Sequence, residues 1–225
     1  MLESLRSLLT GQGPGADVAA LSRWAKQAGH AFKRMREPEG FAIDGRDEGL
    51  AWRLEWGSPQ RSYIEGRELR IRMELGLPPD LQLLLLTAPL LERLERDTFE
   101  AFTRDNQTQM GDAIAEELRW LVMFPKIEMP DPKALSAHFG GVSSVRGRGS
   151  AWIDGALGEA LMRATERLLL KGPPFVLMTL RGRLYLRLQL PSPDAGHIAE
   201  ALELFETASA SALRIADARR GQRDG

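Results

Sequence analysis

The chain contains no cysteine among its 225 residues. Without cysteine, no disulfide framework, thiol nucleophile, cysteine-ligated zinc site or iron–sulfur cluster can form. Charge of one sign is not in excess either, because 30 lysine and arginine residues face 31 acidic residues and the formal net charge is −1. Proteins dedicated to nucleic-acid binding usually show a strong basic excess. We therefore expect no dedicated nucleic-acid binding.

Long apolar runs are also missing. Runs such as Leu83 to Leu86 and Phe175 to Met178 fall far short of the roughly 20 residues that span a bilayer. The first residues lack the apolar core that is typical of a signal peptide. The hydrophobic fraction of 43% is ordinary for a globular chain. From this pattern we expect a soluble, cytoplasmic protein of bacterial type without a transmembrane segment.

Glycine and proline divide the chain into segments. The glycine-rich stretch 11–15 predicts a flexible N-terminal segment over residues 1–16. A single α+β domain is expected over 17–218, followed by a frayed tail over 219–225. Pro125, Pro130 and Pro132 mark a break that would divide this domain into two halves, 17–124 and 133–218.

Hydrophobic periodicity predicts the main elements. Apolar residues at spacings of three and four from Val18 to Met35 predict an amphipathic helix over residues 17–36. The period then changes to two, which predicts strands at 41–44, 51–56, 68–75, 175–180 and 184–190. Residues 81–86 are interpreted as a strand, with a first helical turn as the alternative. Ser192 followed by Pro193 predicts the start of a long final helix.

These elements indicate an α+β fold. We expect an antiparallel sheet of five to six strands in the order α-βββ-α(α)-α-ββ-α, with the helices packed on one face. This order of elements is similar to that of small bacterial secretion chaperones. Proteins of that family pair such sheets into dimers and hold unfolded partner segments on their outer faces. The resemblance is one of topology, without a shared motif, and this chain is longer.

No pattern in the sequence indicates a catalytic or metal site. The three histidines, His30, His138 and His197, lie far apart and form no HExxH motif. A G-x-S-x-G nucleophile elbow and a Walker A sequence are both absent. The acidic stretch 44–48 does not have the spacing of a calcium loop. We therefore predict no catalytic residue, no metal ligand and no cofactor, and the sequence favours a protein that is not an enzyme.

Three features are candidates for binding. The first is the basic segment 18–36, which has no acidic residue between Val18 and Arg36. The second is the loop around residues 138–152, where glycines separate potential anion ligands: His138, Arg146, Arg148 and Trp152. The third is a polar sheet face on which arginine and glutamate interleave, with the basic side chains Arg53, Arg70, Arg72 and Arg187. For each feature the alternative is a solvated surface without a ligand.

Three functional hypotheses follow from these features. The first is a non-enzymatic protein-binding module, chaperone-like or adaptor-like, with one or more protein partners and compatible with a homodimer. The second is an enzyme, or a protein that binds a small molecule or an anion, which uses the 138–152 loop. The third is association with a membrane surface or with nucleic acid through the basic helix 18–36.

Overall fold

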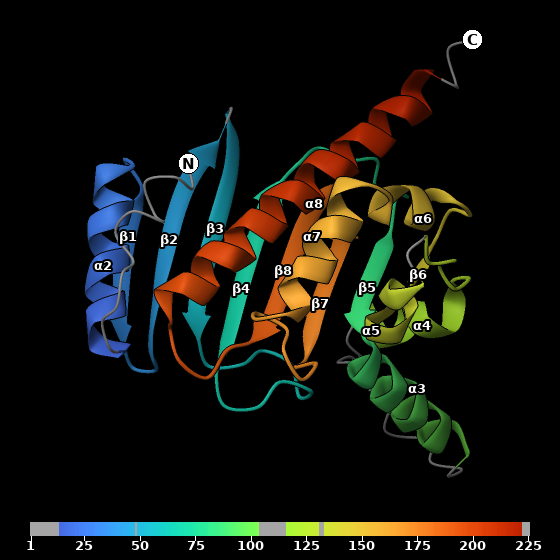
Figure 1. Ribbon diagram of the computed structural model, residues 1–225, viewed down its shortest axis with the longest axis horizontal. Coiled ribbons are helices and arrows are strands. Elements are labelled where there is room, and N and C mark those ends of the chain that lie inside the picture. The colour runs from blue at the N-terminus through green and yellow to red at the C-terminus, as the bar shows by residue number, and fades with distance from the viewer. Residues whose placement is uncertain (1–13, 48, 104–115, 131–132, 222–225) are drawn as a thin grey trace.

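An antiparallel sheet of eight strands forms the centre of the structure (Figure 1). The computed structural model describes residues 14–47, 49–103, 116–130 and 133–221. The strands are β1 (Ala31–Arg36), β2 (Glu39–Asp47), β3 (Leu50–Gly57), β4 (Glu68–Glu74), β5 (Leu83–Thr87), β6 (Phe139–Ser143), β7 (Phe175–Leu180) and β8 (Arg183–Gln189). The predicted α+β class and antiparallel sheet are confirmed, and the sheet has eight strands rather than the predicted five to six.

Seven helices accompany the sheet in the described residues. They are α2 (Pro14–Gln27), α3 (Ala88–Thr103), α4 (Glu116–Met123), α5 (Ala134–His138), α6 (Arg148–Ile153), α7 (Ala156–Thr165) and α8 (Ala195–Gly221). None of these helices is long and apolar enough to cross a membrane. Most of the predicted N-terminal segment and the end of the predicted tail, residues 1–13 and 222–225, lie outside the described residues.

The strand order brings the N-terminal and C-terminal parts of the chain together in one sheet. The strands follow one another across the sheet as β1-β2-β3-β4-β8-β7-β5-β6, so β4 lies directly beside β8. Strands from both predicted halves therefore form one sheet. The segment around Pro125, where the sequence predicted a break, lies along β6. There the N–H of Ile127 donates to the carbonyl of Gly141 at 2.9 Å, and Ser143 donates to Pro125 at 3.1 Å.

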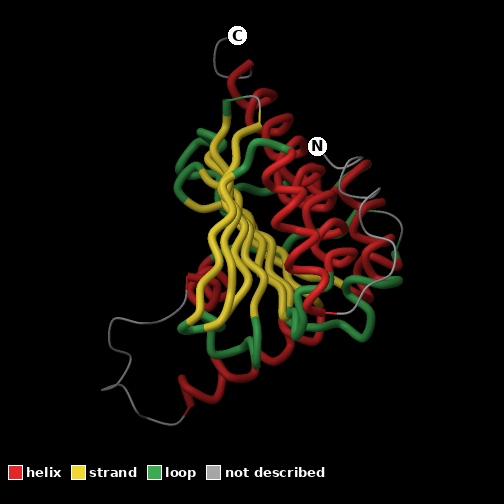
Figure 2. Tube along the Cα trace, turned by 90° about the vertical axis from the view of Figure 1, so that its left-hand side faces the viewer, coloured by secondary structure: helices red, strands yellow, loops and turns green. Residues whose placement is uncertain are grey.

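The main hydrophobic core lies on one face of the sheet. Figure 2 shows most helices on this side, and in Figure 1 α8 and α7 cross in front of the strands. Apolar residues of β3, β4 and β8 alternate toward these helices with almost no exposure, as the period of two predicts. Two buried indoles are hydrogen-bonded within this core, because Trp56 Nε1 of β3 donates to Leu190 after β8 at 2.9 Å and Trp152 Nε1 of α6 donates to Ala208 of α8 at 3.1 Å.

A second, smaller core lies on the other face. Successive leucines of β5 alternate between the two faces, with Leu83 and Leu85 in the main core and Leu84 and Leu86 in the second. The second core is closed by residues of α3 and by Trp120 of α4. The prediction that all helices pack on one face is therefore wrong. Strand β5 is apolar on both sides, so both of its faces need a cover.

The predicted helix over 17–36 is wrong beyond Gln27. The structure ends α2 there, places Gly29 in the left-handed region at a φ of +74°, and continues as strand β1. Strand β1 is the edge of the sheet and buries only Phe32 and Met35 in part. These two residues are three apart, so the strand lacks the alternation that would distinguish it from a helix.

The predicted loop over 138–150 contains strand β6 and the start of α6. Two glycines, Gly140 and Gly141, conceal this strand because they give no hydrophobic alternation. Glycine is required at 141, since a Cβ there would overlap the carbonyl oxygen of Leu84 on the neighbouring strand.

The final helix begins at Ala195 and not at Ser192–Pro193. Asp194 caps it, because its Oδ1 accepts a hydrogen bond from the backbone N–H of His197 at 2.7 Å.

The close approach of Gly141 to the backbone of Leu84 predicts that one added methyl group at position 141 has a large effect on stability. Replacement Gly141→Ala should lower the free energy of unfolding by about 2 kcal/mol, because backbone atoms of β5 cannot move aside as a side chain could. The matched control is Gly57→Ala, where the nearest atom would lie at an ordinary 3.6 Å. Urea denaturation of both variants measures the difference. Equal stability of the two variants would contradict the packing of β6 on β5.

Candidate binding site on the sheet

The polar part of the second face is the candidate binding site. Helices α3 and α4 cover this face at β5, β6 and β7, and no described helix packs over the part formed by β2, β3, β4 and β8. We call that part the open face. Its side chains at the centre are Asp44, Arg53, Glu55, Glu68, Arg70, Arg72, Tyr185 and Arg187. Alternation in the sequence predicts this shared face, and the register confirms it.

Six of these residues form a continuous chain of alternating charge across four strands. Arg53 donates from one terminal nitrogen to both oxygens of Asp44, at 2.9 and 2.8 Å, and from Nε to Glu55 at 2.6 Å. Glu55 also accepts a hydrogen bond from Arg70 Nε at 3.2 Å. The remaining links of this charge chain connect Arg70 through Glu68 to Arg187 on β8.

Glu68 is the most deeply buried member of the charge chain. Its carboxylate has no exposed surface and accepts hydrogen bonds from Arg187 at 2.6 Å and from Arg70 at 3.0 Å. The backbone N–H of Gln60 adds a third bond at 2.7 Å. Arg70 and Arg187 lie directly opposite each other on β4 and β8. Their like charges would repel at this distance, so the carboxylate between them is what makes the arrangement stable.

The ionisation of Glu55 reflects its two arginine partners. Burial by itself would raise the pKa of the Glu55 carboxyl above its ordinary value. The hydrogen bonds and positive charges of Arg53 and Arg70 outweigh burial and lower the pKa. Glu55 therefore stays ionised under all physiological conditions, and the charge chain keeps its alternation.

Arg72 lies beside the charge chain and outside it. The register places it opposite Arg53 on β3 and opposite Tyr185 on β8. The charge chain has three acids and three arginines and is neutral by itself. Within the described residues the exposed Arg72 side chain has no carboxylate partner, so it supplies surplus positive charge. A shallow hollow of about 90 Å³ separates it from the charge chain and Tyr185.

A second buried carboxylate anchors α4 next to this face. Glu117 has no exposed surface and accepts hydrogen bonds from Tyr63 Oη at 2.8 Å and from Arg61 Nε at 3.0 Å. Burial, and then the charge of Glu117, raises the pKa of the Tyr63 hydroxyl, which therefore stays protonated as a donor. This cluster holds the 58–66 loop against α4, at the border of the open face.

The residues predicted as a loop site do not converge. Trp152 is fully buried in the main core, so its indole is unavailable to a ligand. His138 is exposed at the end of α5, and Arg148 reaches toward the Ile215 carbonyl of α8 at 3.4 Å. Arg146 lines a hollow of about 200 Å³, which it shares with Lys126. The predicted clamp of two guanidiniums from Arg146 and Arg148 is therefore not formed.

Some residues of the site are not indicated by any pattern in the sequence. Glu117 sits within an apolar helical pattern, and nothing in its neighbourhood in sequence indicates Arg61 or Tyr63 as partners. The interleaved arginine and glutamate of β3 and β4, which the sequence showed on one face, form a cross-strand ion pair between Arg70 and Glu55. Within the described ranges, no group of three or more histidine or acidic residues is placed to hold a metal ion.

Comparisons with protein-family models, with curated proteins and with solved structures find no match to this chain. The candidate site is therefore defined by its geometry alone. That geometry is a preorganised surface of ion pairs, beside which the exposed guanidinium of Arg72 has no carboxylate partner in the described residues. Such a surface could hold a carboxylate or another anionic group.

The buried carboxylate predicts a large loss of stability in Glu68→Gln. The variant leaves Arg187 without a carboxylate partner and Arg70 with Glu55 alone, and these two guanidiniums, 12% and 14% exposed, face each other across β4 and β8. We expect the free energy of unfolding to fall by about 3 kcal/mol. The control Glu74→Gln removes a carboxylate that is 53% exposed. This variant should change the free energy of unfolding by about 0.5 kcal/mol or less. A Glu68→Gln protein as stable as the control would refute the role of Glu68.

The lowered pKa of Glu55 predicts a pH-dependent contribution to stability. Its ionised form stabilises the folded state at pH values above the ordinary pKa of 4.5, and this contribution is lost as the pH falls through the lowered folded value. At neutral pH the free energy of unfolding of the wild type should exceed that of Glu55→Gln by about 1 kcal/mol. Urea unfolding across the acidic range should show this difference shrinking toward zero. A difference that grows on acidification would contradict the account.

Proposed function

We propose that this chain is a non-enzymatic protein-binding module, chaperone-like or adaptor-like, which holds an acidic segment of its partner on the open face. The observation that carries the proposal is Arg72, an exposed guanidinium without a carboxylate partner in the described residues, beside a charge chain that is otherwise satisfied. A carboxylate of the partner would complete the alternation of charge. It would lie next to Arg72 in the hollow bordered by Tyr185 and Arg187.

Rigidity of the open face supports this role. The guanidiniums of Arg53, Arg70 and Arg187 are each fixed by at least one ion pair, so little side-chain freedom remains to be lost on binding. The hollow of about 90 Å³ is shallow and small compared with pockets for small-molecule substrates. A flat, charged and ordered surface favours a macromolecular partner that covers it.

Site-specific photocrosslinking tests the proposal with the charge chain intact. A photoreactive amino acid replaces Ala51, which is exposed and shares the face of Arg53, and in a second protein it replaces Ala210, which is exposed on α8. In cell extract, position 51 should give discrete adducts with a polypeptide. Addition of Arg72→Gln should reduce these adducts by about tenfold. Arg181→Gln, which removes another exposed arginine, should leave them unchanged.

Three results would overturn the proposal. The first is the absence of adducts at position 51, and the second is adducts that do not depend on Arg72. The third is thermal stabilisation by free phosphate or citrate that requires Arg72 while no polypeptide is crosslinked. That outcome would indicate a small-anion site on the open face instead.

A further inference from the structure

The two edges of the sheet differ in how they are covered. At β6, the backbone of Pro125 and Ile127 makes hydrogen bonds along the outer side of the strand. At the opposite edge, no described segment makes backbone hydrogen bonds to the outer side of β1. An edge strand presents N–H and C=O groups in alternation, and these can accept a further strand.

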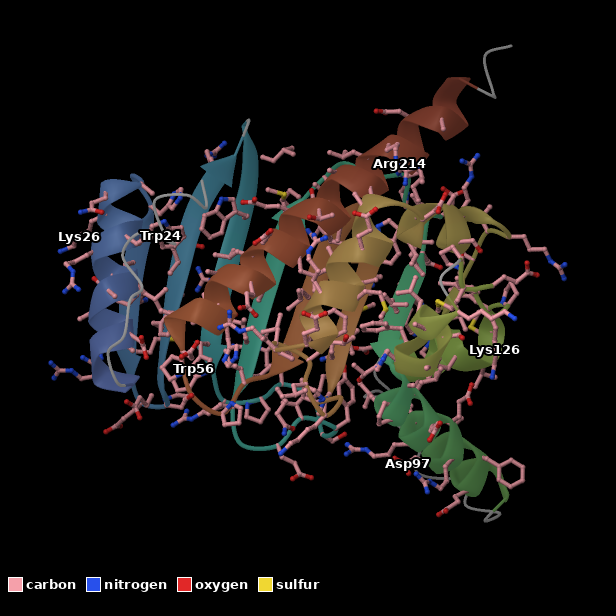
Figure 3. The ribbon with its side chains drawn as sticks, in the orientation of Figure 1. Trp24, Lys26, Trp56, Asp97, Lys126 and Arg214 are labelled. Carbon is pink, nitrogen blue, oxygen red and sulfur yellow. The ribbon has the colours of Figure 1, made fainter. Side chains whose placement is uncertain are left out.

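The β1 edge carries exposed cations that make no ion pair within the described residues. Lys33, Arg34 and Arg36 are exposed on β1, and Arg23 and Lys26 are exposed on the neighbouring α2. We call these five residues the basic edge. None of them makes an ion pair within the described part of the chain. Figure 3 shows Lys26 on the side of α2 that faces away from the sheet, whereas Trp24 lies between α2 and the strands.

We infer that β1 binds an acidic, extended polypeptide segment of a partner protein as a ninth strand of the sheet. The backbone groups of β1 supply the hydrogen bonds of a strand pair, and the basic edge supplies the charge preference. This inference is independent of the open face, because it concerns a different surface and does not involve Arg72.

Other occupants fit this edge less well. A second copy of the chain paired through β1 would bring Lys33, Arg34 and Arg36 against the same residues, and like charges opposite each other destabilise a strand pair. Single-stranded nucleic acid usually stacks its bases on exposed aromatic rings. At this edge Trp24 is fully buried, and Phe32 is partly buried and stacked on Phe41 with ring centroids 5.6 Å apart.

The test uses a fluorescent peptide of alternating glutamate and valine as the probe. Anisotropy should show that it binds the wild-type chain, and hydrogen exchange should show added protection in β1. A second peptide has the same sequence with its strand-pairing amides N-methylated, so that it keeps the charge and cannot donate the hydrogen bonds of a strand pair. It should bind about tenfold more weakly.

Substitutions on β1 test the charge preference. The triple variant Lys33→Gln, Arg34→Gln and Arg36→Gln should bind the acidic peptide about tenfold more weakly than wild type. The matched control neutralises three exposed bases elsewhere, namely Arg96, Lys133 and Arg163. The control and Arg72→Gln should both bind like wild type, which separates this inference from the proposed function of the open face.

Four outcomes would overturn the inference. Equal binding of the N-methylated peptide would show electrostatic attraction without strand addition, and equal binding of a lysine–valine peptide would remove the charge preference. Tighter binding of oligothymidylate to the basic edge would assign it to nucleic acid. Dimerisation through β1, detected by light scattering and lost when β1 is altered, would assign the edge to a second copy.

Discussion

The carboxylate of Glu68 is buried where β4 meets β8, and two arginines approach it from directly opposite positions on these strands. Removal of Glu68 leaves Arg187 desolvated without a carboxylate and leaves Arg70 with Glu55 alone, and removal of a desolvated partner costs more than the pairing gains. Glu68, Arg70 and Arg187 must therefore be positioned together. Since β4 comes from the N-terminal part of the chain and β8 from the C-terminal part, this triad favours a single register between the two parts.

The same need to pair desolvated charges determines how the side chains of the open face are arranged. Glu55 and Glu68 are each shared between two arginines, and Asp44 pairs with Arg53, so these arginines are ordered and the charge chain is neutral. Arg72 lies outside this arrangement and has no acidic partner in the described residues. The five cations of the basic edge at β1 likewise lack carboxylate partners in the described structure. Both surfaces thus present cations without a carboxylate partner in the described residues, and we propose that another molecule supplies it.

Sequence reasoning reached the parts of the fold that depend on local pattern. Alternation in β3, β4 and β8 predicted both the strands and the sharing of one face by Arg53, Arg70 and Arg72. Strand β1 was missed because an exposed edge needs no alternation, and β6 because Gly141 fits against backbone and leaves no apolar signal. The burial of Glu68 and Glu117 depends on how the 58–66 loop and α4 pack over the sheet, and no local pattern encodes such contacts.

Arginine side-chain NMR tests the central claim most directly, which is that the charge chain satisfies its own members and leaves Arg72 unpaired. The Nε–H groups of Arg53 and Arg70 donate to Glu55, so their hydrogens should exchange slowly with solvent. The Nε–H of Arg72 should exchange at the rate of an exposed, mobile arginine. Slow exchange at Arg72, or exchange at Arg53 and Arg70 as fast as at Arg72, would contradict the account.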